Sequence, residues 1–267
     1  MKYLPVVTGP DNMLQAQKTN NKTSQSLSIL IHQDGLSFYI YDSNDIIDKW
    51  YETFESSKNP EEILEAIKEQ ESKKIQFPKS INQITLFYHH NLYTLIPNSI
   101  FKEEHASDYL KYNAHLLKTD VLSNDKINSQ NLVITYIAYQ NINNYFFEKY
   151  GDFTYLHYSS SLLRQEYTDD IHDVNLLIDL FNNDFYLSVF KRGVVIAHNL
   201  FPHQTEEDIL YYVMFAIEQY GLDPTDLLLI LRGNNIPDSL KSLLELYIYN
   251  VKIETEYSRY QEQLLCV

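Results

Sequence analysis

The sequence predicts an α/β protein of two lobes, each with a mixed sheet that starts strand-strand-strand-helix-strand-helix and is flanked by helices. The order of strand-like and helix-like segments in the first half recurs in the second half. The spacing recurs as well: the helix cap Asn59 follows Ile31 by 28 positions, and the helix cap Thr205 follows Ile178 by 27. A chain of 267 residues is long enough to bury a core in each lobe. We therefore expect an internal duplication.

The first lobe opens with a β-hairpin. Leu27–His32 and Leu36–Tyr41 have the composition of strands, and Gln33–Gly35 between them is typical of a tight turn. A third strand is expected over Lys49–Phe54. Residues 1–25 are polar, so we expect a partly disordered leader before residue 26.

A helix follows the third strand, because Asn59 can cap it and Pro60 suits its first position. We expect the next strand at Ile84–Tyr88, paired with Leu92–Ile96 across a hairpin, and a helix over Asp108–Leu117. The lobe is completed, up to residue 172, by two more strands and two more helices; the strands are Leu132–Tyr139 and Phe153–Tyr158, and the helices are Ile142–Tyr150 and Ser160–Tyr167.

The second lobe, residues 173–267, repeats this order. A capping-box pattern at Thr205 to Asp208 opens its first helix, Gly221 ends that helix, and Pro237 starts another. Its strands are expected at Val174–Asp179, Phe185–Phe190, Val194–Leu200, Asp226–Leu231 and Val251–Glu254.

Composition limits the classes of function. The net charge of -15, without a cluster of Lys or Arg, argues against nucleic acid or a membrane surface as the partner. The longest apolar stretch, Tyr211–Ile217, is far shorter than the ~20 residues of a membrane span. Cys266 is the only cysteine, which fits a reducing compartment. We therefore expect a cytoplasmic protein without membrane insertion.

Three segments carry a resemblance to a known family: Ser28–His32, Val174–Phe201 and Leu227–Gly233. Over roughly residues 26–260 the chain resembles a bacterial family defined only as domain-of-unknown-function family 3822. That family is a divergent member of the actin-like ATPase superfamily, which includes sugar kinases, heat-shock chaperones, actin and the actin-like proteins of pilus assembly. The resemblance implies two actin-like, ribonuclease H-like lobes.

The resemblance also implies an Asp-x-Gly-Ser/Thr-like loop in the first hairpin of each lobe, where glycine-turn amides cradle phosphate and the aspartate orients magnesium or water. In the first hairpin, His32 stands at the position of that aspartate, and Asp34 follows two residues later. In the second hairpin, Asp179 matches the aspartate, but Phe181 and its neighbours replace the glycine turn. Both phosphate loops have therefore decayed, each in a different way.

The adenosine-binding segment implied by the resemblance is a strand followed by two glycines. Gly233 keeps one of them, and Asn234 can replace the other because Asn tolerates a positive φ. The residual cofactor-binding candidates are thus Asp34, Asp179, Gly233 and Asn234. For Asp179 we favour the alternative of a strand-end residue that caps a turn.

No catalytic residue and no metal site are expected. His89 and His90 are adjacent, so on a strand they would point to opposite faces. His198 and His203 flank a strand end, with no carboxylate or cysteine to complete a set of ligands. No GxxxxGK[ST] or GxGxxG motif occurs.

The preserved scaffold with decayed loops favours a pseudoenzyme, a catalytically inactive protein-binding or scaffold module without a cofactor. The alternative is a divergent nucleotide-binding ATPase or kinase that holds Mg-ATP in the cleft between the lobes through Asp34 and Asp179. A structural subunit of a larger assembly is a third interpretation. The sequence leaves open which protein is the partner, the oligomeric state and enzymatic activity.

Overall fold

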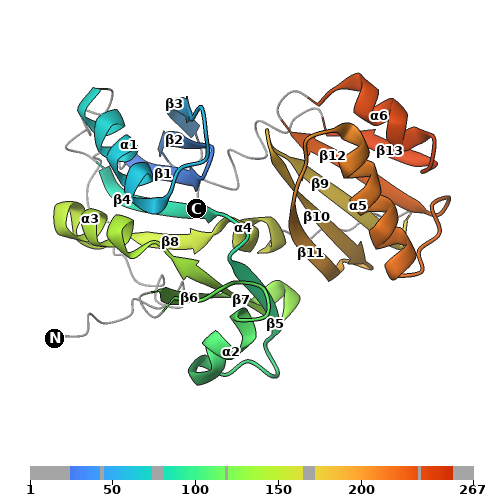
Figure 1. The fold of residues 1–267 in the computed structure, drawn as a ribbon, viewed down its shortest axis with the longest axis horizontal. Coiled ribbons are helices and arrows are strands. Elements are labelled where there is room, and N and C mark those ends of the chain that lie inside the picture. Colours follow the sequence, from blue (N-terminus) through green and yellow to red (C-terminus); the bar gives the residue numbers. More distant parts are fainter. Residues whose placement is uncertain are drawn as a thin grey trace. The chain divides into compact units, whose positions relative to one another are not determined.

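The computed structural model describes residues 25–42, 45–73, 81–117, 120–164, 172–233 and 236–254. The described residues divide into two compact units, one ending at Arg164 and one running from His172 to Glu254 (Figure 1). The predicted leader lies almost wholly outside the described residues, and the domain boundaries predicted from the sequence remain predictions.

A five-stranded mixed sheet forms the first unit, in the strand order β3-β2-β1-β4-β8. The hairpin partners β1 and β2 are antiparallel, β2 pairs antiparallel with β3, and β4 lies parallel to both β1 and β8. Their bounds are β1 (Gln25–His32), β2 (Gly35–Asp42), β3 (Asp45–Thr53), β4 (Ile81–His89) and β8 (Thr154–His157). The third strand therefore begins earlier than the sequence predicts.

Three helices belong to this sheet: α1 (Pro60–Lys73), α3 (Gln140–Tyr150) and α4 (Tyr158–Arg164). Asn59 caps α1 as predicted, since its Oδ1 accepts the N–H of Glu61 and of Glu62 at 3.0 Å each. Helices α1 and α3 lie in contact. The buried carboxylate of Glu71 on α1 links them by accepting hydrogen bonds from Tyr145, Lys149 and Tyr150 on α3.

Between β4 and α3 the chain forms a separate antiparallel sheet of order β5-β7-β6, with β5 (Tyr93–Pro97), β6 (Val121–Ile127) and β7 (Leu132–Ala138). The predicted hairpin between Ile84–Tyr88 and Leu92–Ile96 is wrong. Strand β4 has β1 on one side and β8 on the other, so both of its edges are occupied, and β5 pairs with β7 instead.

The helix expected over Asp108–Leu117 is also misplaced. The chain forms a 3-10 turn, η2 (Glu103–His105), followed by α2 (Ala106–Leu110), and strand β6 was not predicted from the sequence. A second 3-10 turn, η3 (Asn128–Gln130), joins β6 to β7. Helix α2 ends early because only Ala106 and Leu110 reach the core, so nothing stabilises further turns.

The second unit repeats the first sheet without the insertion, in the strand order β11-β10-β9-β12-β13. Its elements are β9 (Val174–Leu180), β10 (Asp184–Lys191), β11 (Val194–Pro202), α5 (Glu206–Gln219), β12 (Leu227–Gly233), α6 (Asp238–Glu245) and β13 (Asn250–Ile253). The predicted succession strand-strand-strand-helix-strand-helix is confirmed in this unit, whose sheet has the same arrangement as the five-stranded sheet of the first.

Both helices of this unit bury their apolar sides in one core with the sheet. Ile209 and Val213 of α5, with Leu240 and Leu244 of α6, pack with alternate residues of β9, β10 and β12. The predicted capping box is present at Thr205, and the chain leaves α5 at Gly221 with φ +60°, a conformation that favours glycine. These local signals are strong, which explains why the helices and strands of this unit could be predicted from the sequence.

Candidate nucleotide site

The β1–β2 hairpin, at the position where the resemblance implies a phosphate loop, uses its polar groups within its own unit. The N–H of Asp34 donates to Nδ1 of His32 at 3.0 Å. The side-chain Oδ1 of Asp34 accepts from Oγ of Ser57 at 2.7 Å, and its main-chain oxygen accepts from the N–H of Phe54 at 2.8 Å. Asp34 therefore fastens the hairpin to the loop that leads into α1.

Gly35 has a packing role in the same hairpin. A Cβ placed on it would lie 2.5 Å from the main-chain oxygen of Glu52 on β3. Glycine is thus required here for the close approach of two strands, which is a reason for it other than phosphate binding.

The β9–β10 hairpin is tied down in a similar way. Phe181 donates its N–H to the main-chain oxygen of Asp184 at 2.9 Å. His203, in the loop before α5, donates its main-chain N–H to the oxygen of Asn183 at 3.0 Å and its Nε2–H to the oxygen of Phe181 at 3.1 Å. The loop before the first helix therefore holds the hairpin in both units, and His203 has a structural role that the sequence did not indicate.

Asp179, the one aspartate that matches the superfamily loop, lies in a buried ion pair. Its side chain is 0% exposed, and its Oδ2 lies 2.5 Å from a terminal nitrogen of Arg232, which is 2% exposed. The two residues are register partners on the parallel strands β9 and β12. Burial raises the pKa of Asp179, while the positive charge of Arg232 acts in the opposite direction. The favoured sequence interpretation, a turn cap, did not anticipate this pairing.

The glycine of the candidate adenosine-binding segment is also accounted for by packing. A Cβ on Gly233 would lie 3.0 Å from the main-chain oxygen of Leu180 and 3.1 Å from its Cβ. Gly233 and Leu180 are register partners, so the glycine lets β12 approach the end of β9 closely. The fourth candidate, Asn234, lies outside the described residues.

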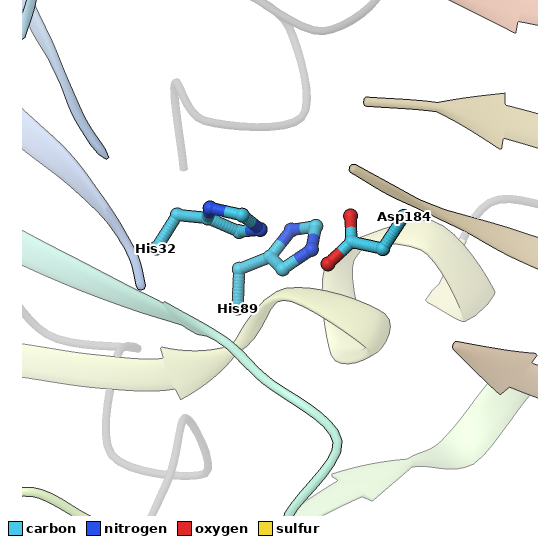
Figure 2. A group of neighbouring side chains, drawn as sticks. All are labelled: His32, His89 and Asp184. Atoms are coloured by element: carbon cyan, nitrogen blue, oxygen red, sulfur yellow. The ribbon is translucent and has the colours of Figure 1, made fainter. Parts of the chain in front are cut away.

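His32, at the superfamily's aspartate position, stands beside a second histidine. His32 ends β1 and His89 ends β4, and the parallel register makes them partners. Their rings meet edge to face, with centroids 4.2 Å apart. Figure 2 shows the two side chains next to each other. The sequence does not indicate this pair, because His32 and His89 lie far apart in the chain and become neighbours only through the strand register.

The carboxyl ends of the parallel strands in the first unit carry further buried histidines. His90 accepts the N–H of Leu92 through Nδ1 and donates from Nε2 to the oxygen of Ile137. His157, at the end of β8, accepts the N–H of Ser159 through Nδ1 and donates from Nε2 to the oxygen of His90. Burial lowers the pKa of His90 to about 4, so it is neutral at pH 7. The two histidine side chains therefore form hydrogen bonds with main-chain groups at the places where the chain turns after a strand.

Asp125 on β6 is a further buried carboxylate, and it was not singled out from the sequence. It accepts hydrogen bonds from the N–H of His157 at 2.8 Å, from Oγ of Ser160 at 2.6 Å and from the hydroxyl of Tyr136 at 3.2 Å. The contacts join both sheets of the first unit and α4. Burial raises the pKa of Asp125 to about 6.

Sheet order, duplication and hairpin positions together define an actin-like ATPase fold. The chain belongs to the family described as "Protein of unknown function (DUF3822)", whose profile matches residues 14–251. Both expectations from the resemblance, the family and the fold, are thereby confirmed.

Solved structures agree on the fold. A Bacteroides thetaiotaomicron protein with actin-like ATPase fold and unknown function is 20% identical, with a TM-score of 0.76 over 92% of this chain and 97% of that one. A chain of the PilM–PilN type IV pilus biogenesis complex is 12% identical, with a TM-score of 0.58 over 91% and 94%. The ethanolamine utilization protein EutJ from Carboxydothermus hydrogenoformans is 9% identical, with a TM-score of 0.51 over 91% and 89%.

The comparison with curated proteins finds no match. Among the helices of the described residues, none has the length and apolar character needed to span a membrane.

Proposed function

We propose that this protein is a pseudoenzyme of the actin-like ATPase fold, which does not turn over nucleotide and acts by binding a protein partner. The observation that carries the proposal is the ion pair between Asp179 and Arg232. An aspartate that orients magnesium or water must reach the ligand, and this one is 0% exposed and bonded to an arginine of the neighbouring strand.

The other described candidates support the same conclusion. Asp34 bonds to Ser57 and to the chain before α1, and Gly233 packs against Leu180. In the hairpins, the N–H of Asp34 donates to His32 and that of Phe181 donates to Asp184. Phosphate would have to displace these contacts, and an imidazole at position 32 cannot replace a carboxylate as a ligand for magnesium.

Three observations favour a protein partner. The fold relative in the PilM–PilN complex belongs to a protein assembly, so the fold is compatible with such a role. In addition, several aromatic side chains on the second unit are exposed, and aromatic residues are enriched in the centres of protein interfaces. The net charge of -15 favours protein over nucleic acid as the partner, and we extend the proposal to a cytoplasmic location.

Phosphate release from Mg-ATP tests the loss of turnover. We expect the purified protein to release phosphate at the rate of the buffer alone, and Asp179→Asn to leave this rate unchanged. Turnover by the wild-type protein that Asp179→Asn abolishes, in a variant whose circular dichroism spectrum shows it to be folded, would support the alternative of a divergent ATPase.

A further inference from the structure

The outer side of α5 carries a stripe of two aromatic rings between two acids. Tyr211 is 63% exposed and Phe215 is 50% exposed, and their rings stack with centroids 6.3 Å apart. Glu207 and Glu218 are exposed on the same side of the helix, since 3.6 residues make one turn. We call these four residues the α5 stripe.

The duplicated fold supplies an internal comparison with α1. Counted from the caps Asn59 and Thr205, the buried residues Ile63 and Ile67 of α1 stand at the positions of Ile209 and Val213 of α5. The two helices are therefore in the same register, residue for residue.

In that register, Tyr211 and Phe215 occupy the positions that Glu65 and Glu69 occupy on α1. Glu65 pairs with Lys68 at 2.7 Å, and Glu69 pairs with Lys73. Helix α1 thus presents solvated ion pairs where α5 presents apolar rings. Exposed aromatic residues cost solubility, so their presence on only one of two equivalent helices indicates an interaction surface.

The charge on α5 indicates what covers the stripe. The helix Glu206–Gln219 contains four acidic residues and no Lys, Arg or His. Asp208 is used by the capping box, and Glu206 accepts a hydrogen bond from Ser239. Within the described residues, no ion pair forms at Glu207 or Glu218. These two residues are separated by about 16.5 Å along the helix axis, at 1.5 Å per residue.

We propose that the α5 stripe binds a basic amphipathic helix of a protein partner. Apolar side chains of that helix and an Arg would lie on the rings of Tyr211 and Phe215, and flanking Lys or Arg residues would pair with Glu207 and Glu218. A second copy of this chain is not the partner we expect at the α5 stripe, because two α5 helices in contact would bring like charges together. The inference rests on the proposed role in protein binding and names its surface and the chemistry of the partner.

A synthetic helical peptide serves as the probe, about 15 residues long, with Leu and Arg on one side and Lys at both ends. Its binding to the full chain is measured by fluorescence anisotropy at about 0.15 M salt. A scrambled peptide of the same composition controls for general attraction to an acidic protein. We expect the amphipathic peptide to bind and the scrambled one to bind much more weakly.

Two double variants assign the binding to the α5 stripe. Tyr211→Glu/Phe215→Glu gives α5 the residues of α1 and adds two negative charges, and it should weaken binding by about tenfold or more. Glu65→Gln/Glu69→Gln removes two charges from α1 and should leave binding unchanged. Attraction by charge alone predicts the opposite order, with tighter binding to the first variant and weaker binding to the second.

The proposal is overturned if the α5 variant binds as tightly as the wild type or tighter, or if the scrambled peptide binds equally well. It is also overturned if sedimentation shows a wild-type dimer that Tyr211→Glu/Phe215→Glu dissociates, since the occupant would then be a second copy. Neither result depends on nucleotide turnover, so this proposal and the loss of ATPase activity can fail separately.

Discussion

Replacing Asp179 with alanine separates a structural aspartate from a catalytic one. Asp179 and Arg232 are almost fully buried, 0% and 2% exposed, with 2.5 Å between their charged groups. Removing one member of a buried pair leaves the other charge without compensation, which costs about 3–5 kcal/mol. We therefore expect Asp179→Ala to lower the free energy of unfolding by this amount. A solvated ligand-binding aspartate would change it by about 0.5 kcal/mol or less.

The assay is urea unfolding followed by circular dichroism, on the wild type, Asp179→Ala and the double variant Asp179→Leu/Arg232→Met. The double variant replaces the pair with apolar side chains and should regain much of the lost stability, because neither charge then remains buried. If the single variant does not fold, the stability of the double variant still tests whether the pair has a structural role. A loss of less than about 1 kcal/mol in Asp179→Ala would refute the structural role.

Three further predictions concern stability. Gly35→Ala should cost about 2 kcal/mol or more in urea unfolding, because its Cβ would lie 2.5 Å from the main-chain oxygen of Glu52; a loss below about 0.5 kcal/mol would contradict the close strand contact. Thr205→Ala should lower the free energy of unfolding by about 1 kcal/mol through loss of the cap of α5, and an unchanged urea midpoint would count against it. Asp125→Asn should remove the contribution of Asp125 to the pH dependence of the free energy of unfolding. The folded-state pKa of about 6 exceeds the ordinary 3.8, so the stabilisation from proton binding is present below about pH 4 and lost as the pH rises through 6. At 1.36 kcal/mol per pKa unit, this contribution is about 3 kcal/mol, and equal slopes for wild type and variant between about pH 4 and 6 would be inconsistent with a raised pKa.

The second unit could be predicted from sequence because its signals are local. The capping box at Thr205, the positive-φ glycine at Gly221 and the apolar strands each act within a few residues. The insertion in the first unit could not be predicted in this way. The pairing of β5 with β7 joins residues about 40 positions apart, and nothing near Tyr93–Pro97 indicates that β4 already has two neighbours.

The same limit applies to the candidate site. Asp179 stands out in the sequence through the resemblance to the superfamily's hairpin loop, but its partner Arg232 becomes a neighbour only through the register of two parallel strands. His32 and His89 meet for the same reason. In the sequence Gly35 marks a tight turn and Gly233 a candidate adenosine-binding segment, and only the distances to Glu52 and Leu180 show why a side chain would clash at either position.

The measurement that most directly tests the central claim is the melting temperature of the full chain in Mg-ATP, with magnesium and inorganic phosphate as the control. A ligand at 100 times its Kd stabilises the native state by about 2.7 kcal/mol. That would raise the melting temperature of a chain of this size by roughly 5 °C or more. Because Asp34 and Asp179 are bonded within their own units, we expect no binding of Mg-ATP and hence no rise over the control. A rise of that size, specific to the nucleotide and lost in the folded Asp179→Leu/Arg232→Met variant, would contradict this expectation.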